Sequence, residues 1–269
     1  MRFRLTIEFA GTRYSGWQIQ KNARTVQGEI DRAVRETISR TPFELYGSGR
    51  TDAGVHALAQ VAHLDVDTTL PTHEIHARLN DALPHDIVIL QVERVRHRFH
   101  ARHDAVARSY LYQIARRKTA FAKPFVWWVK EPLSLDAMRE AAASLVGFHD
   151  FQAFSDDDPG EKSTAVLLEL LDLHADDDLI IVHVEGSHFI WKMVRRLVGV
   201  LVAVGRGELT QGEVVALLTG PSALPARLTA PAAGLFLERV YYEGDRRDVP
   251  IRPPVRLAAF AATSADRER

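Results

Sequence analysis

The sequence predicts an α+β fold made of two ferredoxin-like halves, each with helices packed on one face of an antiparallel sheet. Residues 2–95 follow the order strand, helix, strand, strand, helix, strand, which is the split βαβ pattern of that unit. Residues 109–242 show a similar order with one added helix, although the residues themselves do not visibly repeat. Hydrophobic residues make up 46% of the 269 residues and charged residues 26%, so the chain can fill one large core or two ordinary ones.

The first half begins with a strand at 2–10, where apolar residues occupy alternate positions. Thr25 can cap the next helix, whose buried face recurs at helical spacing as far as Ile38. Patterns of the same kinds predict strands at 43–46, 57–66 and 87–95, and a helix at 72–82 that ends before Pro84.

The second half is predicted from alternation, capping residues and glycine stops in the same way. Its strands are expected at 109–115, 166–173, 179–184 and 234–242, with a short extension at 125–129. Its helices are expected from a Ser134 cap to Leu145, at 190–204 and at 210–218. The predicted parts of the chain are a half at 1–104, a half at 105–244 and a loosely held tail at 245–269.

The helix at 190–204 carries charge on one side. Its apolar residues share one face, and Lys192, Arg195 and Arg196 share the opposite face. A solvated basic face over a buried apolar face is the common arrangement, and the alternative is that the adjoining Ser187-His188-Phe189 at the helix start places side chains into a cleft. The sequence leaves both open.

Composition excludes several kinds of chemistry. The chain has no cysteine, which rules out disulfides, zinc–thiolate sites and cysteine nucleophiles and fits a reducing cytoplasm. Residues 1–4 begin a strand rather than a signal peptide, and no apolar run approaches the roughly 18 residues of a membrane span. We therefore expect a cytoplasmic protein.

The net charge of −1 hides a strong asymmetry. Residues 94–118 contain eight Arg or Lys against one acid, with Phe99, Tyr110 and Tyr112 among them, whereas residues 156–185 contain ten acids against one lysine. Chance clustering of surface charge is the alternative explanation. Cations interleaved with aromatic rings suit a phosphate backbone and stacked bases, so a polyanion is the favoured partner.

The stretch 47–63 concentrates polar chemistry between two predicted strands. Arg50, Asp52 and His56 lie there among three glycines. An ordinary turn explains Asp-Ala-Gly equally well. In an extended loop, an arginine two positions from an aspartate would point the same way and hold an ionised, oriented carboxylate, which can act as a nucleophile or a base.

Other site chemistries find little support. His97, His100 and His103 lack the pattern of a zinc motif, and the acidic run 156–158 is typical of a solvated loop, so no metal is expected. The chain has no Gly-x-x-x-x-Gly-Lys-Ser/Thr, no Gly-x-Gly-x-x-Gly and no Gly-x-Ser-x-Gly. Nucleotide-dependent and serine-hydrolase chemistry are therefore not expected.

Residues 49–57, Gly-Arg-Thr-Asp-Ala-Gly-Val-His-Ala, resemble the active-site signature of the TruA family of tRNA pseudouridine synthases. Further matches follow in order at Gly16-Trp17-Gln18, Thr25-Val26-Gln27-Gly28, Leu79-Asn80, Phe99-His100-Ala101-Arg102, Arg108-Ser109-Tyr110-x-Tyr112, Gly147-x-His149-Asp150-Phe151, Met193-Val194-Arg195 and Thr229-Ala230-Pro231. The resemblance implies the pseudouridine synthase fold, with two RRM-like halves and a central active-site cleft.

The resemblance also implies roles for single residues. Asp52 would be the catalytic aspartate, and Arg50 would pair with it and help to hold a flipped nucleotide. Tyr110 would stack on or contact the base, and Arg195 would lie near the cleft. From the charge pattern we expect RNA contacts at Arg102, Arg108, Arg116 and Arg117.

The reaction implied by the resemblance is an isomerisation, in which uracil detaches from C1′ of the ribose, rotates and rejoins through C5. It would use no cofactor or metal. The resemblance further implies a homodimer that acts on the anticodon stem-loop of tRNA, at uridines 38–40.

One departure from the family lies at 161–166, which reads Glu-Lys-Ser-Thr-Ala-Val where the family usually has an arginine at the start of the strand. It puts one substrate contact or one ion pair in question. Two other functions remain as alternatives. One is a catalytically silent protein that binds or folds tRNA on the same scaffold. The other is a hydrolase of glycosidic bonds, which would need a second carboxylate that the motifs do not show.

Overall fold

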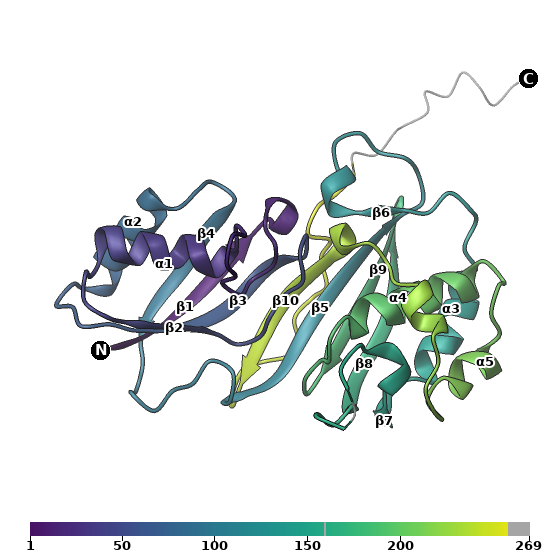
Figure 1. The fold of residues 1–269 in the computed structure, drawn as a ribbon. Coiled ribbons are helices and arrows are strands. Elements are labelled where there is room, and N and C mark those ends of the chain that lie inside the picture. Colours follow the sequence, from purple (N-terminus) through teal and green to yellow (C-terminus); the bar gives the residue numbers. More distant parts are fainter. Residues whose placement is uncertain (159, 258–269) are drawn as a thin grey trace, which may run out of the picture.

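The structure is a computed structural model that describes residues 1–158 and 160–257. Within this part of the chain, ten strands form one mostly antiparallel sheet, and six α-helices pack beside it (Figure 1). The strands are β1 Arg2–Phe9, β2 Glu44–Gly47, β3 His56–Asp65, β4 Ile87–Arg94, β5 Ala105–Ala115, β6 Trp127–Trp128, β7 Gly147–Asp150, β8 Ala165–Asp176, β9 Leu179–Gly186 and β10 Leu235–Tyr242. The helices are α1 Val26–Thr37, α2 Thr72–Ala82, α3 Leu135–Ala143, α4 Met193–Gly205, α5 Gln211–Ala216 and α6 Leu224–Arg227.

Both halves have the strand order of a ferredoxin-like unit. The sheet runs β4-β1-β3-β10-β5-β9-β8-β7, with β2 paired to β3 and β6 paired to β5. When the strands are counted within each half, leaving out the short β6 and β7, β4-β1-β3-β2 and β10-β5-β9-β8 both read fourth, first, third, second. The α+β fold with two ferredoxin-like halves, predicted from the order of elements, is confirmed.

Strand β10 joins the two halves. One edge of β3 is occupied by β1, and the other edge is divided between β2 and β10. β2 pairs with residues 62–65, and β10 pairs in parallel with His56 and Ala57. Because β10 also runs antiparallel to β5, the last strand lies at the centre of the sheet (Figure 1). The connection from β2 to β3 therefore emerges where the halves meet.

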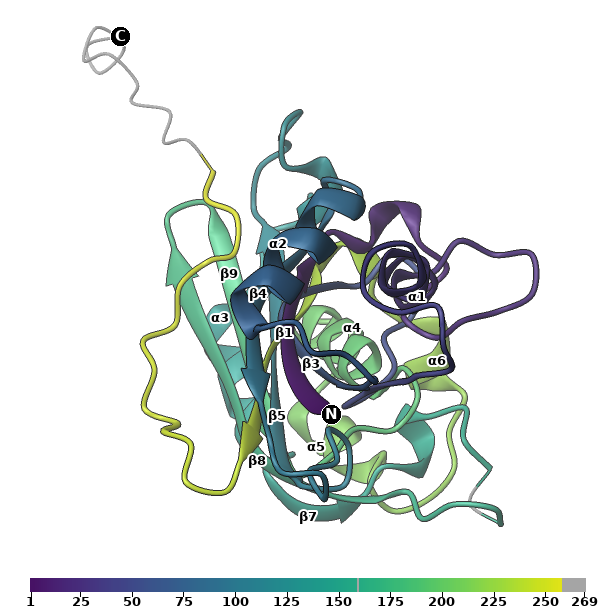
Figure 2. The same ribbon diagram turned by 90° about the vertical axis from the view of Figure 1, so that its left-hand side faces the viewer.

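Among the described residues, two large hydrophobic clusters fill the molecule, one for each half, and a small third cluster lies where the end of β5 meets the start of β9. The first is built mainly from β1, β3, α1 and α2, and the second from β5, β8, β9, α3 and α4. Figure 2 shows α1 and α4 on the same side of the sheet. Tyr110 packs against both clusters, at the boundary between them. No helix in this part of the chain has the length and apolar character that a membrane crossing requires.

Several local predictions match the structure closely. Helix α2 has the predicted bounds, Thr72–Ala82. The Oγ1 atom of Thr25 accepts a hydrogen bond from the Gly28 amide (3.3 Å), and the Oγ atom of Ser134 accepts one from the Ala137 amide (3.4 Å). Both predicted helix caps are confirmed, because capping depends on residues that are close in sequence.

Other local predictions need correction. Helix α4 begins at Met193, later than predicted, because Lys192 adopts a left-handed φ of 63°. The extension predicted at 125–129 is a 3₁₀ turn at Lys123–Phe125 followed by the two-residue β6. Neither β7 nor α6 was predicted. β7 is four residues long and only partly buried, and α6 carries Pro225 in its first turn, where proline fits a helix but suggests a loop.

Residues 245–257 lie against the sheet, on the face opposite α1 and α4 (Figure 2). Arg247 forms ion pairs with Glu169 and, at 2.9 Å, with Glu185. The Val255 amide donates to Oε1 of Gln113 (3.2 Å). This segment is thus held by specific contacts, in contrast to the loose tail predicted at 245–269. The rest of that predicted tail, 258–269, lies outside the described residues.

Candidate active site at the junction of the halves

The connection between β2 and β3, residues 48–55, is called the Asp52 loop below. Its first residues are fixed to β3 by buried polar groups. The Ser48 amide donates to the Val61 carbonyl (2.7 Å), and the Ser48 hydroxyl donates to Oε1 of Gln60 (2.6 Å). The Gln60 amide nitrogen then donates to the Gly49 carbonyl (3.1 Å). Ser48 and Gln60 were not predicted as site residues. The feature that could have identified them is that both are polar residues at buried positions, where polar groups need hydrogen-bond partners.

A second segment braces the Asp52 loop from outside. The Trp17 amide donates to the Thr51 carbonyl (3.1 Å), and the Gly54 amide donates to the Tyr14 carbonyl (3.3 Å). Gly16 has a φ of +93°, and a Cβ atom there would lie 2.5 Å from the Thr51 carbonyl oxygen. Only glycine permits this close approach. The Gly16-Trp17 pair therefore shapes the loop that carries Asp52.

Asp52 pairs with an arginine from the other half of the molecule. Nη1 of Arg195 on α4 lies 3.2 Å from Oδ2 of Asp52, and its Nε donates to the Ala230 carbonyl (2.8 Å). The Asp52 and Arg195 side chains are 25% and 17% exposed, respectively, so solvent still reaches the pair. The carboxylate is thus held in one direction where the two halves meet.

The expected pairing of Arg50 with Asp52 is wrong in this structure. Arg50 is exposed and lines a shallow groove with Trp17, Tyr46 and Arg102. The prediction assumed an extended loop, but residues 50–52 lie outside any strand, between a bend at 48–49 and a turn at 53–54. Among the described residues, the ion partner of Asp52 is Arg195.

Helix α4 directs its basic face inward, which answers the question that the sequence left open. Arg196 is 3% exposed, and its guanidinium pairs with the Asp156 carboxylate. Lys192 pairs with the same carboxylate at 2.7 Å. Together with the contact of Arg195 to Asp52, these pairs show that the basic face points toward the Asp52 loop and the acidic loop.

Tyr110 on β5 completes the group around Asp52. Its ring meets Phe189 edge-on, with ring centroids 5.1 Å apart. Burial raises the pKa of Tyr110 to about 12, against a smaller lowering by Arg108 and with a small further rise from the Asp52 charge. The phenol therefore stays protonated near neutral pH and presents a flat, uncharged ring.

His56, at the end of the signature, is a structural residue. Its Nδ1 accepts from the Gly11 amide (3.0 Å), so Nε2 carries the proton and donates to the Pro124 carbonyl (3.0 Å). Burial lowers its pKa, and its ring stacks on Phe236 at 4.7 Å. His56 thus ties the Asp52 loop to the turn after β1 and to the segment before β6.

The remaining predicted RNA-contacting residues are spread along the molecule. Arg102 is exposed beside Arg50 in the shallow groove. Arg108 donates to backbone carbonyls of the segments around it. Arg116 and Arg117 bind the β8–β9 turn, about 20 Å along β5 from Tyr110 at roughly 3.3 Å per residue. The structure does not bring these two to the cleft.

Where the family usually has an arginine, Thr164 takes part in a local contact. Its hydroxyl donates to Oδ1 of Asp150 (2.6 Å), and its carbonyl accepts from the Phe151 amide (3.0 Å). This position therefore supports the turn after β7 without a cation.

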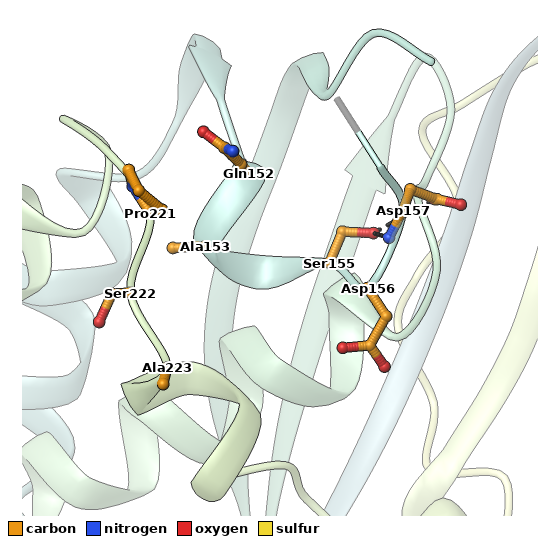
Figure 3. A pocket seen from close by; sticks show the side chains of 8 residues that line it. All are labelled: Gln152, Ala153, Ser155, Asp156, Asp157, Pro221, Ser222 and Ala223. Carbon is orange, nitrogen blue, oxygen red and sulfur yellow. Dashed lines mark hydrogen bonds between the residues drawn. The ribbon is translucent and has the colours of Figure 1, made fainter. Parts of the chain in front are cut away.

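A cavity of about 350 Å³ that Asp52 does not line lies near the start of α4 (Figure 3). It is lined by Gln152, Ala153, Ser155, Asp156, Asp157, Pro221, Ser222 and Ala223. Asp156 is bound by two cations, and Asp157 accepts from the Trp191 amide (2.9 Å). These contacts fasten the acidic loop to the start of α4, whereas Asp52 lies in the 49–57 signature and remains the candidate active-site residue.

Comparison with known proteins points to one family. A family model described as tRNA pseudouridine synthase matches residues 5–104 and 141–243, which include Asp52 and Arg195. The protein named tRNA pseudouridine synthase A of Thermoanaerobacter sp. (strain X514) is 38% identical over 242 residues, covering 88% of this chain and 98% of that protein. The proteins named tRNA pseudouridine synthase A 2 of Clostridium tetani and of Bacillus anthracis are both 37% identical over 243 residues, covering 89% of this chain and 98% and 99% of those proteins.

Proposed function

The chain belongs to the tRNA pseudouridine synthase family, and from this premise we propose that Asp52 is the residue with which it isomerises uridine in the anticodon stem-loop of tRNA. Members of this family are isomerases. The bond from C1′ to N1 of uracil breaks, and a bond from C1′ to C5 forms. The proton on C5 leaves and N1 gains one, so the reaction balances without an oxidant or a second substrate.

The observation that carries the proposal is the pairing of Asp52 with Arg195 across the two halves. Arg195 is itself fixed by the Ala230 carbonyl, so the carboxylate has a defined direction. A carboxylate held in this way can attack C1′ as a nucleophile or remove a proton from the ribose as a base. Either role requires the uridine to leave the RNA stack and enter the cleft.

The groups beside Asp52 suit an extruded nucleotide. Tyr110 presents a protonated, flat ring against which uracil can stack. Arg50 and Arg102 line the adjoining groove, where they can contact phosphates of the same strand. Flipping a base costs a few kcal/mol of unstacking, which such contacts offset.

The wider setting follows from the family resemblance. We propose a homodimer in which both subunits contribute to the RNA-binding cleft, acting in the cytoplasm on uridines 38–40. The reaction itself needs no metal or organic cofactor.

The test uses tRNA transcript carrying tritium at C5 of uridine. Release of tritium without free uracil is expected for isomerisation, and unlabelled tRNA treated in the same way should keep its mass. The Asp52→Asn variant should bind the tRNA and release no tritium. Free uracil would identify a hydrolase instead, and tRNA binding with no release by the wild-type protein would favour the catalytically silent alternative.

A further inference from the structure

Arg108 has an unusual set of partners. Its Nη1 donates to the carbonyls of Ser187 (3.0 Å) and Ala105 (3.5 Å). Its Nη2 donates to the carbonyls of Ser48 (3.2 Å) and Arg102 (3.0 Å). The two terminal nitrogens of a guanidinium carry four N–H groups, and here all four meet backbone oxygens.

This arrangement conflicts with the phosphate contact predicted for Arg108. Arginine binds phosphate in a bidentate manner through neighbouring N–H groups, which are already used. Arg108 is half-buried, and burial lowers its pKa. Among the described residues, no carboxylate lies within ion-pair distance of it, and the four carbonyl dipoles compensate its charge.

The four carbonyls belong to three separate segments. Ser48 begins the Asp52 loop. Arg102 and Ala105 lie in the connection between the halves and at the start of β5. Ser187 begins the connection from β9 to α4, the helix that carries Arg195. One side chain therefore ties the segments that lead to both members of the Asp52–Arg195 pair.

The strand that carries Arg108 also carries Tyr110. Residues two apart on a strand point to the same face, so the side chains of Arg108 and Tyr110 lie on one face of β5. A shift of Arg108 would thus reach the loop, the helix and the aromatic ring together.

We infer that Arg108 is a positioning residue: it holds the Asp52 loop and the approach to α4 at the spacing in which Asp52, Arg195 and Tyr110 meet. The inference rests on the proposed function, because it assigns a purpose to that geometry. Lysine cannot replace it, since an ammonium group has three donors at one point and cannot span four carbonyls in a plane.

The experiment compares Arg108→Lys and Arg108→Ala with Arg102→Ala as the matched control. For each, the rate of tritium release at saturating tRNA, the KM and the salt dependence of tRNA binding are measured, together with thermal unfolding. Arg108→Lys should lower the saturating rate by about 10- to 100-fold, as expected when reacting groups are displaced by about an ångström. Its salt slope should match that of the wild-type protein. Arg102→Ala should instead lower the slope by about 0.9, the value for one lost phosphate contact.

A second readout separates positioning from a general loss of stability. Guanidinium ion at a concentration below that which unfolds the protein should restore the rate of Arg108→Ala several-fold, whereas sodium chloride of equal ionic strength should not. A reduced salt slope with an unchanged saturating rate in Arg108→Lys would overturn the inference. The inference would also be overturned if the rate of the Arg108 variants fell only in proportion to the fraction of folded protein and guanidinium ion did not restore it.

The outcomes distinguish this inference from the proposed function. If Asp52→Asn still releases tritium, the proposed function fails, whatever the Arg108 variants do. If Asp52→Asn is inactive and Arg108→Lys behaves as a lost phosphate contact, only the positioning role fails.

Discussion

The connection between the second and third strands is built differently in the two halves, although the strand order is the same. In the first half it is the Asp52 loop, and in the second it is the β8–β9 turn at 177–178. Both contain an aspartate bound by arginine. Asp52 pairs with Arg195, and Asp178 pairs with Arg117.

The difference lies in where the arginine comes from. Arg117 follows β5 in the same half as the turn, and the pair is more than one-third exposed on the surface. Arg195 comes from the other half, because β10 inserts beside β3 and brings α4 to the Asp52 loop. An arginine–aspartate pair is common on protein surfaces and contributes little there. The Asp52–Arg195 pair differs from such surface pairs because it lies at the junction of the two hydrophobic cores.

The largest effect is expected from exchanging each aspartate for its amide. Asp52→Asn should lower the saturating rate of tritium release by about 1,000-fold or more, because it removes the only carboxylate proposed to act on the ribose. Asp178→Asn should leave that rate unchanged. If Asp52→Asn and Asp178→Asn lowered the rate of tritium release equally, the Asp52 loop would not differ in function from the β8–β9 turn.

The next largest effect concerns the histidine on the third strand of the first half. His63 is fully buried, and desolvation, with smaller contributions from Arg2 and His100, lowers its pKa to about 4. The folded state therefore binds fewer protons than the unfolded state, whose histidine titrates near about 6.5. The contribution of His63 to the free energy of unfolding is therefore fully present above about pH 6.5. It is lost as the pH falls toward about 4, and the total loss is up to about 3 kcal/mol.

Urea unfolding between pH 4 and 7 measures this dependence, with His63→Gln as the comparison. The variant should show a smaller loss of stability with acid than the wild-type protein. An identical pH dependence in both would show that His63 is not the group responsible.

A smaller effect is expected at two glycines with positive φ. Gly16→Ala and Gly207→Ala both place a side chain in the left-handed region, which costs about 1–2 kcal/mol. Only Gly16 faces a close neighbour, the Thr51 carbonyl, whereas a Cβ at Gly207 meets no atom within 4 Å. Gly16→Ala should therefore lower stability further and reduce the rate by about 10-fold, since Thr51 must move with Asp52.

Thermal unfolding and the saturating rate measure the two parts of this prediction. If both variants lose equal stability and keep full activity, the contacts of residues 14–17 do not determine the geometry of the Asp52 loop.

The smallest effect concerns the salt dependence of RNA binding. Arg102→Ala should reduce the slope of log K against log salt by about 0.9. Arg116→Ala should leave it unchanged, because the Arg116 guanidinium donates to the Asp177 carbonyl of the β8–β9 turn. A reduced slope for Arg116→Ala would instead support the RNA contact predicted from the basic stretch.

The sequence predicted the features that depend on near neighbours along the chain. Thr25 and Ser134 cap helices because each accepts from an amide three residues ahead, and β1 alternates because a strand places successive side chains on opposite faces. The same local signals predicted the order of elements, from which both ferredoxin-like halves follow. The resemblance of residues 49–57 predicted the family.

Tertiary structure alone decided which groups meet. Arg50 is two residues from Asp52 and points elsewhere, whereas Arg195 is 143 residues away and holds the carboxylate. Arg108 and Arg116 belong to one basic stretch, yet one binds three segments near the cleft and the other binds a distant turn. The physical reason is that charge and spacing are properties of the local chain, whereas the partner of a charged side chain is set by the order in which strands enter the sheet.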